Sequence, residues 1–165
     1  MLSNLINNST TFDSLFFPLL PEKKVNKVKR FKRVLIIDDD QRMSHLLQDL
    51  LQFDPNLKVS IAQDPYDAMD MMTDQAFDLI VLEWNLPVLN GLETLLATER
   101  GFKFEPNLPL EWDDKKVPVI ILSGCEKSEC KPPYTKHFRY LAYINKANNI
   151  ENIIENLRYQ FQRAS

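Results

Sequence analysis

The run Val-Leu-Ile-Ile-Asp-Asp-Asp at residues 34–40 decides the fold. Its apolar part is typical of a strand that is buried on both faces, as in a parallel sheet. A second strand pattern at residues 77–82 ends in Leu-Ile-Val-Leu and is also followed by an acid, Glu83. A third pattern at residues 117–122 is followed by Ser123. Each buried strand is therefore predicted to end at a polar side chain.

Helical patterns alternate with these strands. After Asp40, which can cap a helix, apolar residues recur at helical spacing: Met43, Leu46, Leu47, Leu50 and Leu51. The pair Asp64-Pro65 is typical of a second helix start, with Met69 and Met72 facing inward. Further helical patterns cover residues 91–100 and 150–161, and weaker strand patterns cover residues 57–61 and 140–144.

Strands that alternate with helices predict an α/β fold built from βαβ units with a parallel sheet. Five strands in roughly 130 residues indicate a doubly wound sheet inside a three-layer α/β/α sandwich. Ligands of such sheets bind outside the carboxyl ends of the strands. The residues that follow each strand are therefore the candidate site.

Composition is that of an ordinary globular domain. The chain has 165 residues, a formal charge of −3 and 44% hydrophobic residues. The longest apolar runs fall far short of the roughly 20 residues that cross a bilayer, and the N-terminus does not resemble a secretory signal. Two cysteines cannot hold together a fold of this size, so we expect a reducing, cytoplasmic location and no membrane partner.

Two segments do not fit the βαβ pattern. Residues 1–32 are polar and then basic, with a net charge of +5 over residues 1–33, and we predict a poorly ordered N-terminal arm before a domain at residues 33–165. The stretch at residues 101–116 is predicted to be an insertion, in which Trp112 is a candidate partner contact. Pro132-Pro133 rules out a regular helix between the last two strands.

The strand ends carry a distinctive set of groups. Carboxylates follow the first and third strands, a hydroxyl follows the fourth and an ammonium follows the fifth: Asp38, Asp39, Glu83, Ser123 and Lys146. Carboxylates that lie close together repel unless a divalent cation or a lysine neutralises them. Mg²⁺ suits such oxygen ligands, and the hydroxyl and ammonium can hold a phosphoryl group. Taken alone, Asp38 or Asp40 could equally be a helix cap, and a lysine such as Lys146 is more often a surface residue.

These motifs resemble the receiver domain of two-component response regulators. The matching segments are Ile36 to Asp39, Phe77 to Pro87 with Asn90 to Glu93, Val117 to Gly124, and Tyr143 to Lys146. The resemblance covers residues 33–163 and implies a flavodoxin-like sheet with strand order 2-1-3-4-5. It also implies a regulatory domain in phosphorelay signal transduction, without enzymatic activity of its own. A histidine kinase or a downstream regulator is the implied partner, and a homodimer remains open.

The resemblance also implies a role for each residue of the set. Asp39 would bind Mg²⁺ directly, Asp38 would act mainly through water, and the backbone carbonyl of Asn85 would face the metal. Glu83, at the phosphoacceptor position, completes this candidate metal set. Ser123 and Lys146 would contact the phosphoryl group. Ser123 and the aromatic residue Tyr143 would be the switch residues.

The chain departs from the family at the central position. Glu83 stands where the family has its phosphorylated aspartate, and Ala147 stands where a proline usually follows the lysine in a cis bond. Glutamate is longer by about one C–C bond, roughly 1.5 Å. Misplacement by about 1 Å can cost 100-fold in rate, so we predict a pseudo-receiver whose state does not depend on phosphorylation.

Other functions were weighed against this interpretation. A phosphorylatable receiver that uses Mg²⁺ remains the main alternative, and a regulator that contacts nucleic acid through the basic arm is a weaker one. A phosphohydrolase would need small and hydroxyl residues after the first acids, and a flavodoxin would need a phosphate loop there. Cys125 and Cys130 lack further ligands for zinc.

Overall fold

The structure is a computed structural model, and it describes residues 32–101, 116–130 and 135–164. Its elements are β1 (Lys32–Ile37), α1 (Gln41–Leu51), β2 (Leu57–Ala62), α2 (Pro65–Asp74), β3 (Leu79–Leu82), α3 (Gly91–Gly101), β4 (Val117–Ser123), β5 (Phe138–Asn145) and α4 (Ile150–Arg163). Most of the predicted arm and nearly all of the predicted insertion, with Trp112 and Pro132-Pro133, lie outside these ranges.

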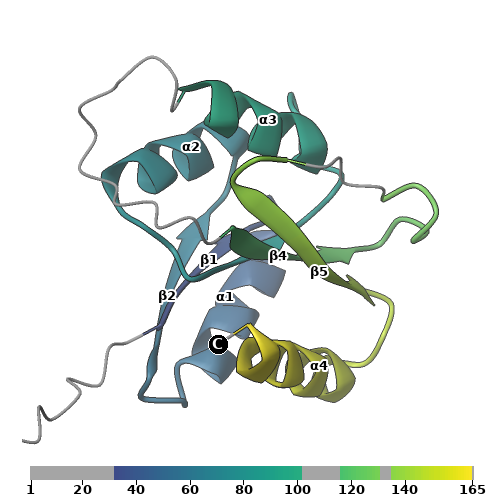
Figure 1. The fold of residues 1–165 in the computed structure, drawn as a ribbon. Helices are drawn as coiled ribbons and strands as arrows, with labels where there is room; N and C mark the ends of the chain where they lie inside the picture. Colours follow the sequence, from purple (N-terminus) through teal and green to yellow (C-terminus); the bar gives the residue numbers. More distant parts are fainter. Residues whose placement is uncertain (1–31, 102–115, 131–134, 165) are drawn as a thin grey trace, which may run out of the picture.

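The five strands form a single parallel sheet in the order β2-β1-β3-β4-β5. Helices α1 and α4 cover one face, and α2 and α3 cover the other (Figure 1). The expected α/β/α sandwich and strand order are confirmed. Because every strand points the same way, the carboxyl ends of the strands share one edge of the sheet.

Strand β1 shows why its sequence is a continuous apolar run. Val34 and Ile36 pack into the layer under α1 and α4, whereas Leu35 and Ile37 pack into the layer under α2 and α3. Each of the four side chains is no more than 1% exposed. Full burial of one such side chain contributes about 2 kcal/mol, so both faces of β1 stabilise the fold.

Local capping fixes where the helices begin. The Asp40 carboxylate accepts hydrogen bonds from two backbone N–H groups of α1, at 3.0 and 3.2 Å, as its N-cap role predicts. Asp64 caps α2 in the same way. The prediction for the buried face of α1 was partly wrong. Leu47 and Leu51, one turn apart, are fully buried, but Leu46 is 44% exposed because it lies to the side of that stripe.

The connection from β4 to β5 differs from the other crossovers. Its described residues, 124–130 and 135–137, contain turns and bends but no helix, whereas α1, α2 and α3 separate the earlier strands. Strand β5 is longer than the predicted residues 140–144, and β3 begins two residues later than predicted, at Leu79. The described part of this connection is therefore a loop rather than a packed crossover helix.

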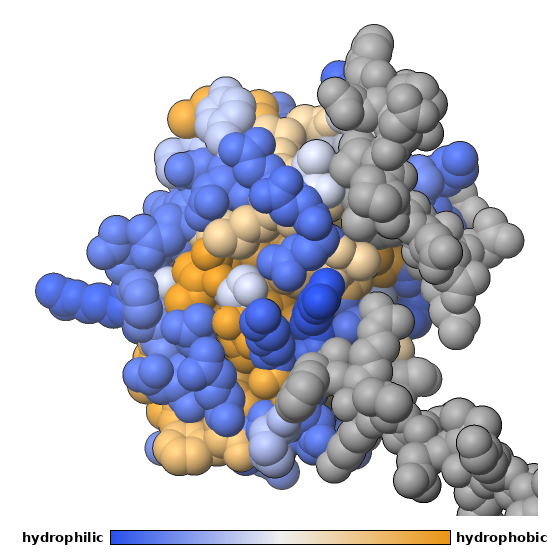
Figure 2. Space-filling view, turned by 90° about the vertical axis from the view of Figure 1, so that its left-hand side faces the viewer, coloured by the Kyte–Doolittle hydropathy of each residue, from blue (hydrophilic) through white to orange (hydrophobic). Residues whose placement is uncertain are grey.

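The side of the molecule at the left of Figure 1, where α2 and β2 lie, is drawn in Figure 2. Hydrophilic residues cover most of this face, and hydrophobic residues show through near its centre. Among the described helices, none combines the length and apolar character that crossing a membrane requires.

Candidate functional site

The site forms where the parallel ladder continues past the strands. The backbone N–H of Asp38 donates to the Ala62 carbonyl at 3.1 Å, and that of Glu83 donates to the Ile37 carbonyl at 2.8 Å. The N–H of Lys146 donates to the Ser123 carbonyl at 2.9 Å. These hydrogen bonds fix the backbone at the ends of β1, β3, β4 and β5. The side chains that follow the strands are therefore held at one edge.

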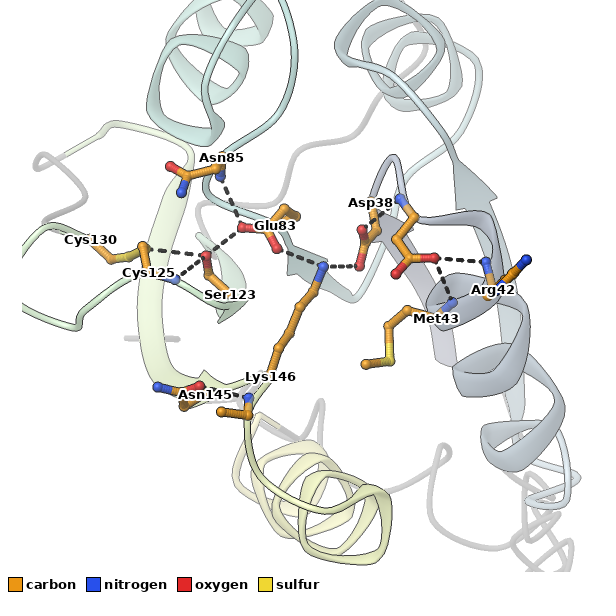
Figure 3. A network of polar contacts seen from close by, with 12 residues as sticks. Asp38, Arg42, Met43, Glu83, Asn85, Ser123, Cys125, Cys130, Asn145 and Lys146 are labelled. Carbon is orange, nitrogen blue, oxygen red and sulfur yellow. Dashed lines mark hydrogen bonds and ion pairs between the residues drawn. A yellow bond between two sulfur atoms is a disulfide. The ribbon is translucent and has the colours of Figure 1, made fainter.

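An ammonium group lies between two carboxylates at this edge. Lys146 Nζ is 2.7 Å from Asp38 Oδ2 and 2.6 Å from Glu83 Oε2. The Lys146 side chain is 17% exposed, and those of Asp38 and Glu83 are 2% and 7% exposed. Figure 3 shows the lysine reaching from the β5 end toward both acids. One cation thus neutralises only part of a buried pair of negative charges.

The second oxygen of the Glu83 carboxylate is also occupied. Glu83 Oε1 accepts a hydrogen bond from the Ser123 hydroxyl and another from the Asn85 backbone N–H, at 2.9 Å for the latter (Figure 3). Asp38 Oδ1 accepts from the Asp40 N–H at 3.0 Å. Buried carboxylates need such donors to offset the loss of water. Every carboxylate oxygen of Asp38 and Glu83 therefore has a protein donor.

Burial and hydrogen bonding shift the pKa values of these groups in different directions. Burial raises the pKa of Asp38, and Lys146 offsets only part of this effect. Burial alone would also raise the pKa of Glu83, but hydrogen bonds from Lys146, Ser123 and Asn85 hold it below 4.5. Burial opposes the charge on Lys146, yet its two acidic partners raise its pKa. The site therefore favours a charged Glu83–Lys146 pair at neutral pH.

Gly91 lets α3 begin directly beside the site. Its N–H donates to the Trp84 carbonyl at 2.8 Å. A Cβ at this position would lie 2.9 Å from the Glu83 backbone carbonyl oxygen, closer than side-chain carbons normally come. The small residue thus permits the close approach of the chain after β3 to α3.

Tyr143 lies beside the site and contacts the loop after β4. A bulge in the β4–β5 pairing places Tyr143 opposite Ile121. The Tyr143 hydroxyl donates to the backbone carbonyl of Cys125. Burial raises the pKa of Tyr143, and the nearby Glu126 raises it further. Its predicted role as a switch residue stays a prediction, and its hydroxyl contacts the loop after β4.

Sequence reasoning missed one feature of this loop. Cys125 and Cys130 form a disulfide, and Cys125 Sγ lies 3.2 Å from Ser123 Oγ. The available signal was the position of Cys125 two residues after the strand end, close to a second cysteine in the sequence.

The structure does not bring all the predicted residues together. Asp38, Glu83, Ser123 and Lys146 meet, but Asp39 is exposed, because adjacent residues in extended chain point in opposite directions. Within the described ranges, no group of three or more acidic, His or Cys side chains is placed to hold a metal. The metal roles predicted for Asp38, Asp39, Glu83 and the Asn85 carbonyl stay predictions.

The turn after Lys146 is compatible with alanine. Among the described residues no peptide bond is cis. The Ala147 N–H donates to the Asn145 side-chain oxygen at 2.7 Å, and a proline at this position could not make that bond. Ala147, which stands where the family usually has a proline, thus makes a backbone hydrogen bond that a proline could not make.

Comparisons with solved structures agree on the fold. The response regulator domain of Thermotoga maritima CheB matches with a TM-score of 0.59 and 22% identity, covering 82% of this chain and 96% of that one. The Francisella response regulator 1452 receiver domain matches with a TM-score of 0.57 and 23% identity, covering 81% and 99%.

Curated proteins match over shorter stretches. The transcriptional regulatory protein CpxR of Escherichia coli K12 is 35% identical over 65 residues, which is 39% of this chain and 27% of that protein. A protein-glutamate methylesterase/protein-glutamine glutaminase of Pyrococcus abyssi is 36% identical over 93 residues, 56% of this chain and 22% of that protein. The chain thus matches about a quarter of the length of these relatives.

A family comparison covers far more of the chain. Residues 34–158 match the response regulator receiver domain. This range includes all five strands except the first two residues of β1. The matched range is well over half of the 165 residues. The chain therefore belongs to the family of response regulator receiver domains.

Proposed function

We propose that this receiver domain is a pseudo-receiver, which acts in two-component signalling through protein contacts and without phosphorylation of Glu83. One observation carries the proposal. The Glu83 carboxylate is bound by the Lys146 ammonium, the Ser123 hydroxyl and a backbone N–H, at 2.6 Å for the ammonium and 2.9 Å for the N–H. An ammonium, a hydroxyl and an amide are the donors that a phosphoryl group would otherwise recruit.

The charge and shape of Glu83 support this function. Its side chain reaches roughly 1.5 Å farther than an aspartate would, toward Ser123 and Lys146. A carboxylate in this position supplies negative charge to both donors, although it has fewer oxygens than a phosphoryl group. The contacts of Glu83 with Ser123 and Lys146 would thus stay in a single arrangement.

The same contacts disfavour attack by Glu83 on a phosphoryl donor. In-line phosphoryl transfer requires a free, aligned nucleophilic oxygen and is sensitive to errors of about 1 Å. Both oxygens of Glu83 already accept hydrogen bonds or ion pairs. Nucleophilic attack would require these contacts to break first.

The donor set also fits Mg²⁺ poorly in this arrangement. Mg²⁺ prefers near-octahedral oxygen ligands, several of them water. Lys146 Nζ contacts one oxygen of each buried acid, and the third predicted acidic ligand, Asp39, is exposed and outside that pair. The proposed function therefore contains no step that uses a metal.

The test is phosphorylation of the full chain by acetyl phosphate in the presence of Mg²⁺. We expect no stable adduct of about 80 Da on Glu83, as judged by intact mass and peptide mass spectrometry. The matched variant is Glu83→Asp, which shortens the side chain by one carbon, and we expect it to gain the adduct. A stable adduct on the unmodified protein would overturn the proposal in favour of a phosphorylatable receiver.

Partners are proposed to be a histidine kinase or a downstream regulator in the cytoplasm. The connection between β4 and β5 differs from a regular crossover, and the insertion at residues 101–116 is predicted to add surface of its own. We therefore expect deletion of residues 103–114 to change the set of proteins recovered in a pull-down. An unchanged set would contradict a role for the insertion in partner choice.

A further inference from the structure

The loop after β4 contains a disulfide that the proposed function does not use. It joins Cys125 to Cys130, which are the two cysteines of the chain. Cys130 is 4% exposed and packs against Trp84 and Ile121, whereas Cys125 is only partly buried. The disulfide thus ties an exposed loop to a small apolar cluster beside the site.

Cys125 contacts both of the predicted switch residues. Its N–H donates to Ser123 Oγ at 3.3 Å, and its Sγ lies 3.2 Å from the same oxygen (Figure 3). The Tyr143 hydroxyl donates to its backbone carbonyl. Since Ser123 also donates to Glu83, a chain of contacts links the disulfide to the ion pairs.

The geometry points to a reversible thiol–disulfide site at Cys125 and Cys130, which is reduced by a dithiol. We infer that its redox state sets the conformation of residues 124–130 and, through Cys125, the positions of Ser123 and Tyr143. This inference rests on the proposed function only in taking this loop to be part of the surface that contacts protein partners. In a reducing compartment, disulfides that occur are usually transient or redox-sensing.

Reduction of the disulfide proceeds by two thiol–disulfide exchange steps. A thiolate of the dithiol attacks Cys125 Sγ, the protein S–S bond breaks, and its electron pair passes to Cys130 Sγ, which takes up a proton. The second thiolate of the dithiol then attacks the first dithiol sulfur, which is bonded to Cys125 Sγ in the mixed disulfide. This step releases Cys125 Sγ, which is also protonated. The protein gains two electrons and two protons, and the dithiol becomes a disulfide. Attack occurs at Cys125 because it is the more exposed sulfur.

The consequence of reduction is local. The bond closes a loop with a sequence separation of only 5, and a short closed loop constrains the unfolded chain little. Residues 126–129 are exposed, and a hydrogen bond from the Glu129 N–H to the Glu126 carbonyl, at 2.9 Å, closes a turn among them. Loss of the bond should therefore loosen the loop far more than it lowers the overall stability.

The test uses the full chain, equilibrated with oxidised glutathione or with dithiothreitol. Reduction should add about 2 Da to the intact mass and should expose two thiols to alkylation. Amide hydrogen exchange in residues 123–130 should become faster by on the order of tenfold, and reoxidation should reverse the change. Exchange in β1, which the disulfide does not contact, is the internal control and should stay the same.

The double variant Cys125→Ser/Cys130→Ser is the matched control. It should exchange as fast as the reduced protein in residues 123–130 and should not respond to dithiothreitol. Two free thiols after equilibration with oxidised glutathione would overturn the inference, as would exchange that does not change on reduction. An acetyl phosphate adduct on Glu83 would contradict the proposed function alone, so the two failures are distinguishable.

Discussion

The two halves of the sheet place their functional groups in different ways. In the half built on β1 and β3, the strands are covered on both faces by helices, and Asp38 and Glu83 follow fully buried apolar runs. In the half built on β4 and β5, the described part of the connection is a loop, which the Cys125–Cys130 disulfide closes. The first half supplies the acids, and the second supplies the groups that bind them.

The buried acids and the loop of the other half therefore have different roles. The acids are held by a rigid core, so their positions follow from the fold. Ser123 and Tyr143 contact the loop that the disulfide closes, so we expect their positions to follow the state of that loop. Regions that respond to a signal are drawn from the less stable parts of a protein. The β4–β5 half is therefore where we expect regulation to act.

Core truncations should show the largest effect and should differ between the halves. Ile80 and Ile121 are both 0% exposed, but Ile80 packs into the large layer under α2 and α3, and Ile121 packs into the small cluster with Trp84 and Cys130. We expect Ile80→Ala to lower the free energy of unfolding by about 4 kcal/mol. Ile121→Ala should cost about 2 kcal/mol, because the loop can collapse onto the cavity.

Chemical denaturation of both variants checks this difference, with the slope of the transition compared as a control for changes in the unfolded state. Equal losses would mean that the loop is packed as firmly as the helices. In that case the contrast between the two halves would not hold.

Removal of Lys146 should have the next largest effect, because this residue joins the two halves. Lys146→Met leaves Asp38 and Glu83 buried without their shared cation, which we expect to cost about 3 kcal/mol at neutral pH. The loss should shrink in acid, where the carboxylates take up protons. The matched control is Lys58→Met on the exposed side of β2, which should change stability by less than about 0.5 kcal/mol. A similar effect of both variants would show that the ion pairs contribute nothing.

The sequence was sufficient for the five strands and for the residues at their carboxyl ends, and insufficient for the loop between β4 and β5. The apolar runs before Asp38 and Glu83 predict two adjacent strands, and parallel strands bring their carboxyl ends together. Lys146 could be placed with them because its strand is parallel too. Alternation along the extended chain turns Asp39 outward, away from the side on which Asp38 lies. The two nearby cysteines were a weak signal for the disulfide, because the path of a loop depends on contacts such as that of Cys130 with Trp84.

The pH dependence of stability should distinguish the two acids of the first half. Because the pKa of Glu83 in the folded protein is below its ordinary value of 4.5, Glu83 stabilises the fold above that pH, and this contribution is lost as the pH falls through the folded value. Asp38 behaves in the opposite way. Its folded pKa is above 3.8, so stability falls as the pH rises from 3.8 through the folded value.

Denaturation at about pH 5 and about pH 3 tests these signs. Glu83→Gln should lose less stability on acidification than the unmodified protein, and Asp38→Asn should lose more. The difference should be smaller than the effect of losing Lys146, since one unit of pKa shift is worth about 1.4 kcal/mol. The same slope in both variants would mean that the two carboxyl groups titrate alike and that Lys146 does not favour Glu83.

Removal of a helix cap should have the smallest effect on stability. One cap is at the start of α1, which follows β1 in the first half, and the other is at the start of α4, which follows β5 in the second half. The Asp40 carboxylate accepts two backbone hydrogen bonds at the start of α1, and the Asn149 side chain accepts one at the start of α4. Asp40→Ala should therefore cost about 1 kcal/mol and Asn149→Ala about half as much. Asp40→Asn keeps an acceptor oxygen and should restore most of the loss. If Asp40→Asn were as unstable as Asp40→Ala, the role of Asp40 would lie in its charge beside the site rather than in capping.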